Sequence, residues 1–363
     1  MTPLESLLIR RIATTGPITL AEYMADCLLH PDHGYYTTRE PFGAQGDFTT
    51  APEISQMFGE LLGLCLAQYW LDLGAPAPFT LAELGPGRGT LMADVLRATA
   101  RVPGFHAAAQ VTLVEASPTL RARQRATLGD HPVHWLATVA DLPAQPLFLL
   151  ANEFFDALPI RQFTRDPAGW RETMVTVTED RLSFALSSPA PIAALDHRLA
   201  DTTPGEIVEI CPAAAPITAE IAARITAQGG TALLIDYGGW RSRGDTLQAL
   251  RAHAFADPLA HPGEADLTAH VDFAALARAA APCPASELTP QGTLLARLGI
   301  EARANALAQR LTGAALQAHL AATRRLTDPA EMGTLFKALA LHAPGTKPPP
   351  GFAPGPAHPG QTC

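Results

Sequence analysis

The sequence predicts an α/β fold in which a parallel, doubly wound sheet binds a ligand at the carboxyl ends of its strands. Apolar runs without alternation occur at 79–84, at 110–115 and in PLFLLANEF, and such runs are typical of strands covered by helices on both faces. A glycine-rich turn follows the first run, and segments with helical spacing separate the others. At 363 residues, the chain can bury one large core or two modest ones.

Composition narrows the class of function. A net charge of −9 and the lack of a long Lys/Arg run argue against a nucleic-acid partner. The five cysteines are scattered and form no CxxC pair, so we expect no metal site and no disulfide framework. No run of 18 apolar residues occurs, which predicts a protein without membrane insertion and, with the reduced cysteines, a cytoplasmic one.

The N-terminal segment predicts two helices and a loop. Leu4, Leu8 and Ile12 follow helical spacing, which indicates an amphipathic helix rather than a signal or transit peptide, and a second helix is expected over Leu20–Leu29. The aromatic, glycine-punctuated loop HGYYTTREPFGAQGDFTTAPE favours a mobile lid. Its last residues, Thr50 to Glu53, predict a capping box that starts a buried helix from about Ala51 to Leu73.

The remaining elements follow from pattern and punctuation. Alternation in 173–178 and 182–186 predicts a small antiparallel insertion beyond the fourth strand, of the kind that forms one wall of a substrate cleft. The other expected elements are strands at 133–136, 207–210 and in GGTALLIDYGG, helices at 216–228 and from about Asp272, and two last strands within 288–298 and 334–341. The tail from 343 is rich in proline and glycine and predicts an extended or disordered segment.

These elements predict three parts of the chain. Residues 1–78 form an N-terminal helical cap with the lid loop, and residues 79–342 form the main α/β domain with a substrate-side insertion at about 160–206. Residues 343–363 form the tail.

The organising stretch is FTLAELGPGRGT, from Phe79 to Thr90. Glu83 lies just inside the strand end, and Gly85, Gly87 and Gly89 follow at alternate positions. Glycine permits positive φ and brings the backbone close to a ligand, and the helix that follows presents its first amides to it.

The spacing of this turn indicates which ligand binds. It reads GxGxG and so departs from the GxGxxG of nicotinamide-binding proteins. Acidic residues before the glycines (Glu83) and after the second strand (Glu115) suit a ligand with a cationic amino acid part and a ribose diol. S-adenosylmethionine has both, with Glu115 accepting hydrogen bonds from the ribose hydroxyls. A glycine turn in some other α/β protein is the alternative.

The end of the fourth strand carries the residues expected to act on the substrate. Asn152, Glu153 and Asp156 follow an unbroken apolar run. Two carboxylates at this place can hold a guanidinium by bidentate hydrogen bonds and can take the proton released after methyl transfer. Alternatively, Glu153 and Asp156 cap the following turn or pair with Arg161. Asp236, near the end of the fifth strand, is expected to order a turn.

Several stretches together resemble one family. They are GYYTTREPFGAQGDFTTAPEISQMFGELLG, LAELGPGRGTLMADVLR, VEASPTLRARQ, LANEFFDALPIRQF, LLIDYG and GDTLQALRAHAFADPLAHPGEADLTAHVDF, which span about Gly34 to Phe273. In this combination the chain resembles the MidA-type SAM-dependent methyltransferases, which include the mitochondrial complex I assembly factor.

The resemblance implies a class I methyltransferase fold, Rossmann-like, with strand order 3-2-1-4-5-7-6 and the last strand antiparallel. It implies S-adenosylmethionine as cofactor and symmetric dimethylation of an arginine in the 49-kDa-type subunit of NADH:quinone oxidoreductase during complex I assembly. Carried over by position, the catalytic residues are Glu153 and Asp156, and the cofactor ligands are Gly46, Asp47, Phe48, Glu83, Gly85, Gly87, Gly89, Glu115 and Asn152.

One departure from the family pattern concerns adenine. No acidic residue directly follows the third strand, where Trp135 to Thr138 come instead, so backbone groups or Asp141 would have to bind the adenine amine. A methyltransferase for a small molecule or another protein side chain, a SAM-binding assembly chaperone and a nicotinamide oxidoreductase remain alternatives. A homodimer is compatible with the sequence, which does not fix the oligomeric state.

Overall fold

The structure is a computed structural model that describes residues 1–38 and 50–355. The predicted cofactor ligands Gly46, Asp47 and Phe48 lie outside the described residues. The chain forms two compact units, one of 1–48, 156–214 and 241–272, and the other of 49–155, 215–240 and 273–363. We call them unit 1 and unit 2. Unit 1 joins the N-terminal helices to the antiparallel insertion, which the predicted domain boundaries separate.

Unit 2 contains the predicted parallel sheet. Its strands run in the order β15-β16-β10-β5-β2-β3-β4, in which β16 is antiparallel to β10 and the five strands from β10 to β4 are parallel. This is the expected order 3-2-1-4-5-7-6. The strands are β2 (Phe79–Leu84), β3 (Ala109–Val114), β4 (Val133–Leu136), β5 (Leu147–Asn152), β10 (Gly230–Gly239), β15 (Thr289–Pro290) and β16 (Phe336–His342).

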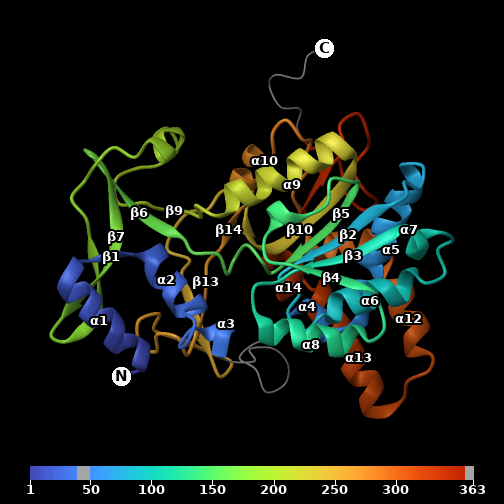
Figure 1. The fold of residues 1–363 in the computed structure, drawn as a ribbon, viewed down its shortest axis with the longest axis horizontal. Helices are drawn as coiled ribbons and strands as arrows, with labels where there is room; N and C mark the ends of the chain where they lie inside the picture. The colour runs from blue at the N-terminus through green and yellow to red at the C-terminus, as the bar shows by residue number, and fades with distance from the viewer. Residues whose placement is uncertain (39–49, 356–363) are drawn as a thin grey trace. The chain divides into compact units, whose positions relative to one another are not determined.

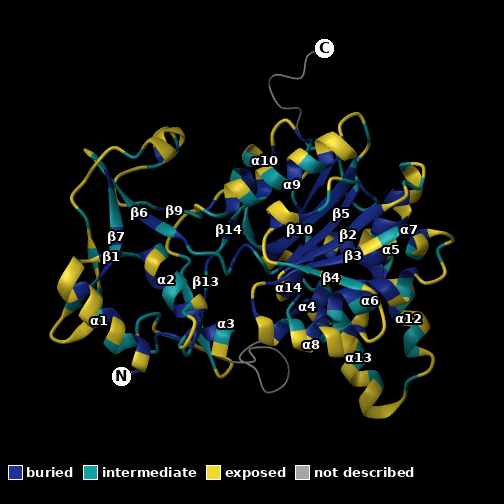
Figure 2. Cartoon of the chain, viewed as in Figure 1, coloured by how far each residue is buried: buried dark blue, intermediate teal, exposed yellow. Residues whose placement is uncertain are grey.

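Helices cover both faces of this sheet, which explains the apolar runs without alternation: all residues of β2 and β5 are buried (Figures 1 and 2). The helices α5, α6 and α8 lie on one face, and α9 and α10 on the other. The helices of unit 2 are α4 (Ala51–Ile54), α5 (Gln56–Asp72), α6 (Thr90–Thr99), α7 (Phe105–Ala108), α8 (Pro118–Leu128), η1 (Val139–Asp141), α9 (Ala214–Gln228), α10 (Phe273–Ala280), α11 (Gln291–Arg297), α12 (Ile300–Ala308), α13 (Gly313–Thr327) and α14 (Met332–Leu335).

Three expectations for unit 2 are corrected. The helix expected from Ala51 to Leu73 is broken at Ser55, which is extended (φ −158°, ψ 133°) and whose hydroxyl accepts from the amide of Met57 to start α5. The capping box is absent, because the Thr50 side chain makes no cap hydrogen bond. Most of 288–298 is helical, and its strand, β15, has only two residues.

The tail is packed as far as the structure describes it. Phe352 is buried in the core of unit 2, and the Cys65 thiol donates to the carbonyl of Pro350 at 3.3 Å. Of the two states expected for the tail, extended or disordered, the disordered one is therefore wrong for residues 343–355.

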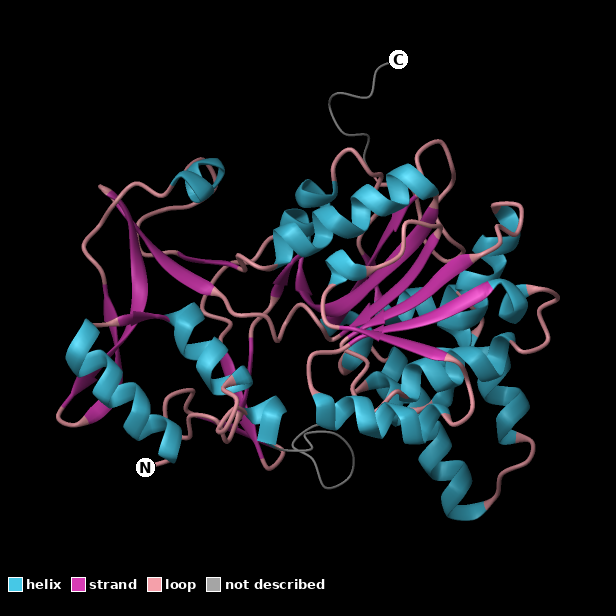
Figure 3. Cartoon of the chain, in the orientation of Figure 1, coloured by secondary structure: helices cyan, strands magenta, loops and turns pink. Residues whose placement is uncertain are grey.

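Unit 1 contains the predicted antiparallel strands, together with the N-terminal helices (Figure 3). One sheet has the order β1-β7-β6-β9 with β8 paired to β7, and a second has the order β12-β11-β13. Apolar residues of α1 and α2 share a core with β7, β8 and β13. The elements are α1 (Pro3–Thr15), β1 (Ile18–Thr19), α2 (Leu20–Leu29), α3 (Tyr35–Thr38), β6 (Arg161–Asp166), β7 (Gly169–Thr178), β8 (Arg181–Leu186), η2 (Ala193–Arg198), β9 (Ile207–Ile210), β11 (Gln248–Arg251), β12 (Ala254–Ala256), β13 (Asp266–Thr268) and β14 (Val271–Asp272).

Candidate cofactor and substrate site

The site begins at the glycine turn, which joins β2 to α6. Gly85, Gly87 and Gly89 have φ of 56°, 51° and 83°, so all three occupy the left-handed region that the sequence anticipated. A Cβ at Gly85 would lie 3.0 Å from the ring of Phe154. The turn therefore has both the backbone conformation and the close approach that exclude side chains, and it directs the first amides of α6 toward the carboxyl edge of the sheet.

A second segment is attached to this turn. The Glu53 carboxylate in α4 accepts a hydrogen bond from the Thr90 hydroxyl at 2.6 Å and lies 3.8 Å from the Arg88 guanidinium. This contact was not expected from the sequence. The Thr that follows the glycines was visible in GRGT, but its partner lies 37 positions away and no local pattern indicates it.

Glu115 directly follows β3, the strand next to β2. It is 8% exposed, and its carboxylate accepts from the Ser117 amide at 2.8 Å and from the Gln124 side chain at 3.2 Å. Burial raises the pKa of Glu115, and these two hydrogen bonds act in the opposite direction. Gln124 is a second residue that sequence reasoning missed.

Glu83 lies within β2, two residues before the first glycine of the turn. Its side chain is 4% exposed, and within residues 1–38 and 50–355 its Oε2 has no hydrogen-bond partner. Burial raises the pKa of Glu83 to about 8, against a hydrogen bond from the Met92 backbone that lowers it. Burial thus disfavours the charged form of this carboxyl, and its assignment as a ligand of a cationic group stays a prediction.

The end of β5, the strand on the other side of β2, carries Asn152 and Glu153. Glu153 has φ of 52°, an uncommon backbone conformation for a residue with a side chain. Its carboxylate accepts from the amide of Ala51 at 3.2 Å and from the Asn152 side chain at 3.0 Å. The Asn152 Oδ1 is buried and has no partner among the described residues.

Asp236, which lies in β10, orders the chain after β5, as expected. Its carboxylate accepts from the amides of Phe155 at 3.0 Å and of Tyr237 at 3.0 Å. The turn that carries Glu153 is thus held by the neighbouring strand.

Asp156 belongs to unit 1, where it begins the segment 156–214, whereas Glu153 belongs to unit 2. The Asp156 carbonyl accepts from the Ala269 amide at 3.0 Å. The joint action of the two carboxylates on one guanidinium stays a prediction. The alternative pairing with Arg161 is not found, because Arg161 forms a bidentate ion pair with Glu172 at 2.7 and 2.6 Å.

The two tyrosines of the expected lid pack within unit 1. Tyr35 is fully buried in its core, and the Tyr36 hydroxyl donates to Asp266 at 2.8 Å. The rest of the loop, residues 39–49, lies outside the described residues.

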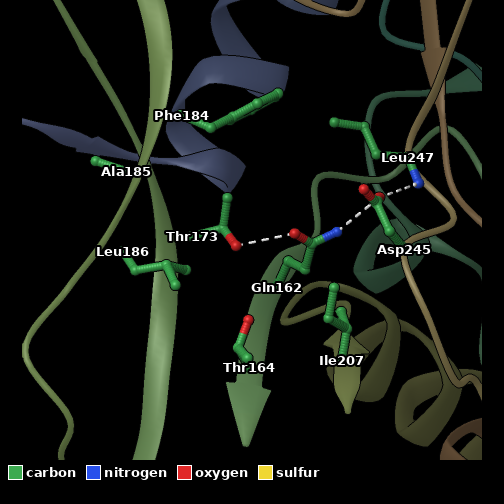
Figure 4. Close-up of a pocket in the computed structure, with 9 residues that line it drawn as sticks. All are labelled: Gln162, Thr164, Thr173, Phe184, Ala185, Leu186, Ile207, Asp245 and Leu247. Carbon is green, nitrogen blue, oxygen red and sulfur yellow. Dashed lines mark hydrogen bonds between the residues drawn. The ribbon is translucent and has the colours of Figure 1, made fainter. Parts of the chain in front are cut away.

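A hollow of about 320 Å³ lies within unit 1, on the face formed by β6, β7, β8 and β9 (Figure 4). The Thr173 hydroxyl donates to Gln162, and the Gln162 amide donates to Asp245 at 2.8 Å. Phe184 and Leu186 line the same hollow and are 45% and 44% exposed. None of the predicted cofactor or substrate residues lines it.

Two negative findings hold for the described part of the chain. No group of three or more His, Cys, Asp or Glu side chains there could hold a metal ion. No helix there is long and apolar enough to cross a membrane.

The site fits S-adenosyl-L-methionine. The glycines of the turn allow a ligand to approach the backbone closely. Glu115 supplies a carboxylate at the end of the neighbouring strand. The buried Oδ1 of Asn152 is a hydrogen-bond acceptor that has no donor among the described residues. These three groups lie at the carboxyl ends of the adjacent strands β2, β3 and β5.

Comparisons with known proteins agree with this fit. Residues 61–291 match the profile of a family described as "Putative S-adenosyl-L-methionine-dependent methyltransferase". A crystal structure from Burkholderia thailandensis with S-adenosyl-homocysteine bound superposes with a TM-score of 0.81 and 31% identity, covering 93% of this chain and 91% of that one.

Curated relatives are similar over most of their length. The protein arginine methyltransferase NDUFAF7, mitochondrial, is 38% identical in Bos taurus and in Homo sapiens, over 94% of this chain and 83% of each relative. The Drosophila melanogaster homolog is 36% identical over 91% of this chain and 83% of its own length. These names are of mitochondrial proteins, so the expectation of a cytoplasmic protein is contradicted.

Proposed function

Because this chain belongs to the family of S-adenosyl-L-methionine-dependent methyltransferases, we propose that it methylates an arginine side chain of a protein. The observation that carries the proposal is the 38% identity, over 94% of the chain, to relatives named protein arginine methyltransferases. The proposal is also supported by Glu153, which follows β5, the neighbour of the strand β2 that leads into the glycine turn. A carboxylate is the group that best orients a guanidinium.

The proposed roles follow the geometry of the strand ends. S-adenosylmethionine, when bound, supplies an activated methyl group. Gly85, Gly87 and Gly89 give backbone amides to its amino acid part, and Glu115 accepts from the ribose hydroxyls. The other proposed cofactor contacts are Glu83, Asn152 and, from the segment outside the described residues, Gly46, Asp47 and Phe48.

Glu153 and Asp156 are proposed to act on the substrate. Two carboxylates fix the guanidinium so that one nitrogen faces the methyl group, because methyl transfer is a displacement that depends mainly on alignment. The same carboxylates take up the proton that the nitrogen loses after transfer. The Glu153 carboxylate accepts a hydrogen bond from the amide of Ala51, so a bound guanidinium would either share this carboxylate with Ala51 or displace the amide.

The proposal extends to a substrate. The family resemblance favours symmetric dimethylation of a 49-kDa-type subunit of NADH:quinone oxidoreductase during complex I assembly. An acidic protein with a net charge of −9 suits a basic target segment, which an arginine-containing loop provides. Formation of a homodimer stays a prediction, which light scattering of the purified chain tests.

The test compares strains of the source organism. In a strain that lacks this gene, mass spectrometry should find loss of dimethylarginine from the 49-kDa-type subunit, and the wild-type gene should restore it. The Glu153→Gln variant should fail to restore it, whereas Glu287→Gln, an exposed carboxylate outside the site, should succeed. If the modification persists in the deletion strain, the substrate assignment is wrong. If Glu153→Gln restores both the modification and assembly, Glu153 has no catalytic role.

A further inference from the structure

Gln124 is a buried glutamine on a largely exposed helix, whose other buried residues are Leu120 and Leu128. It lies in α8, and its side chain is fully buried. A buried amide has two donors and one acceptor oxygen to satisfy, so its environment must supply partners of the right kind. Here the partners come from three neighbouring strand ends.

The amide of Gln124 makes three hydrogen bonds. Its Nε2 donates to the carbonyl of Gly87 at 2.9 Å and to the carboxylate of Glu115 at 3.2 Å. Its Oε1 accepts from the indole N–H of Trp135 at 2.8 Å. One side chain thus joins the glycine turn after β2, the carboxylate after β3 and the indole in β4.

The orientation of this amide is fixed by its partners. The Gly87 carbonyl can only accept and the Trp135 indole can only donate, so a flipped amide would set oxygen against oxygen and N–H against N–H. The Nε2 must therefore face Gly87 and Glu115. Trp135 is itself held, because the guanidinium of Arg125 lies 4.5 Å above its ring.

The helix that carries Gln124 is also attached to the same strand ends. Arg121, one turn earlier on α8, donates to the carbonyl of Glu115 at 2.7 Å and to that of Leu136 at 3.0 Å. A Cβ on Gly89 would lie 3.4 Å from Cα of Gln124, so the turn and the helix are in direct van der Waals contact. The position of the Gln124 amide relative to the glycine turn and to Glu115 is therefore set by backbone packing.

We propose that Gln124 is a positioning residue that makes the site selective for the ribose hydroxyls of its cofactor, by holding the Glu115 carboxylate and the glycine turn in one fixed relation. The proposal rests on the proposed role of Glu115 as the ribose ligand. One oxygen of Glu115 is held by the Ser117 amide and the other by Gln124, so the carboxylate cannot rotate away from a single orientation. Trp135, which stands where an acidic residue was expected, serves this network through its N–H.

The test measures ligand selectivity rather than activity alone. Isothermal calorimetry on the full chain compares S-adenosylhomocysteine with its 2′,3′-dideoxy analogue. The wild type should bind the analogue at least tenfold more weakly. Gln124→Met keeps the length of the side chain and its helix propensity but removes the amide. It should bind S-adenosylhomocysteine about tenfold more weakly, the effect of losing one hydrogen bond to a charged group, with little change for the analogue.

The matched control is Gln291→Met, which replaces another buried helical glutamine of unit 2, one whose amide donates to the Leu326 carbonyl at 3.0 Å. It should leave the selectivity unchanged. Trp135→Phe removes only the indole N–H and should reduce the selectivity by a smaller factor, so the proposal stays testable if Gln124→Met does not fold.

The outcomes separate two failures. If the wild type does not bind S-adenosylhomocysteine, or binds both ligands equally, the proposed function or the role of Glu115 is wrong. If the wild type is selective and Gln124→Met is equally selective, or loses affinity for both ligands to the same extent, Gln124 has no positioning role and the inference is overturned.

Discussion

The hydroxyl of Thr90 donates a hydrogen bond of 2.6 Å to the carboxylate of Glu53, and so connects α4 to the first residue of α6. This contact gives the glycine turn a support from a segment that precedes the sheet in the chain. It also places α4 beside the turn on one side while Glu153 holds the first amide of α4 on the other.

Removing this contact should loosen the turn. We expect Thr90→Val to lower the free energy of unfolding by about 1 kcal/mol, because the partly buried Glu53 loses its donor. A double-mutant cycle with Glu53→Ala, which removes the acceptor, should give a coupling of about 1 kcal/mol in urea unfolding. Thr323→Val, which removes a hydroxyl that donates to a carbonyl of its own helix, is the control and should show no coupling to Glu53→Ala. Additive effects of Thr90→Val and Glu53→Ala would show that the contact is not formed in solution.

The third glycine of the turn can be compared with a glycine elsewhere. Gly89 and Gly299 both precede a helix in the left-handed conformation, with φ, ψ of 83°, 12° and 92°, 30°. Alanine at either position should cost about 1–2 kcal/mol of stability, since a residue with a Cβ is disfavoured in the left-handed conformation that both glycines adopt. Only Gly89→Ala should weaken binding of S-adenosylhomocysteine in calorimetry. Equal affinities for the two variants would place the cofactor away from this turn.

Glu83 should make the stability of the protein fall as pH rises. Burial raises its pKa to about 8, against an ordinary value of 4.5, so the folded state holds a proton that the unfolded state releases. Its contribution is fully present below pH 4.5 and is lost as pH rises to about 8, with a slope of about 1.4 kcal/mol per pH unit. Glu83→Gln should therefore gain stability relative to the wild type between pH 5 and pH 8 in cofactor-free urea titrations. A difference between the two proteins that does not change with pH would show that Glu83 is ionised throughout.

The contribution of Glu60 to stability should change with pH in the opposite direction. Burial raises its pKa, but hydrogen bonds from Arg303 and Arg97 outweigh burial and leave the pKa below its ordinary value. Its contribution is present above the ordinary pKa of 4.5 and is lost as pH falls through the lowered value.

Replacing Glu60 should release α12 from α5, because Arg303 Nε donates to Glu60 at 2.7 Å. We expect Glu60→Gln to cost about 1–3 kcal/mol at pH 7 and less in acid, by urea unfolding at each pH. Glu301→Gln, an exposed change on the same helix as Arg303, should cost less than about 0.5 kcal/mol. Equal effects of the two variants would show that the Glu60 ion pairs add nothing to stability.

The sequence predicted those parts of the fold that depend on local pattern. Apolar runs and flanking breakers located β4 and β9 to the residue, as helical spacing did α2. The strand order was predicted too, although it came from the family resemblance rather than from periodicity. The break at Ser55 was not predictable, because serine fits a helix start as well as a helix interior and only its extended backbone separates α4 from α5.

The candidate site was predictable where its residues stand beside a strand end. Gly85, Glu115 and Glu153 directly follow buried strands. This position alone indicated that they belong to the site. Gln124 and Thr90 were missed because their partners are fixed by tertiary packing. The order of the tail was missed for the same reason, since the carbonyls of Pro350 and Gly351 accept hydrogen bonds from Cys65 in α5 and Arg297 in α11, which no composition reveals.

Transfer of labelled methyl groups from S-adenosylmethionine by the purified chain, into protein from the gene-deleted strain, tests the central claim most directly. The account predicts label on arginine after hydrolysis, with a loss of at least about 100-fold for Glu153→Gln while that variant still binds S-adenosylhomocysteine. Label on another residue, or no label although the cofactor binds, would contradict it.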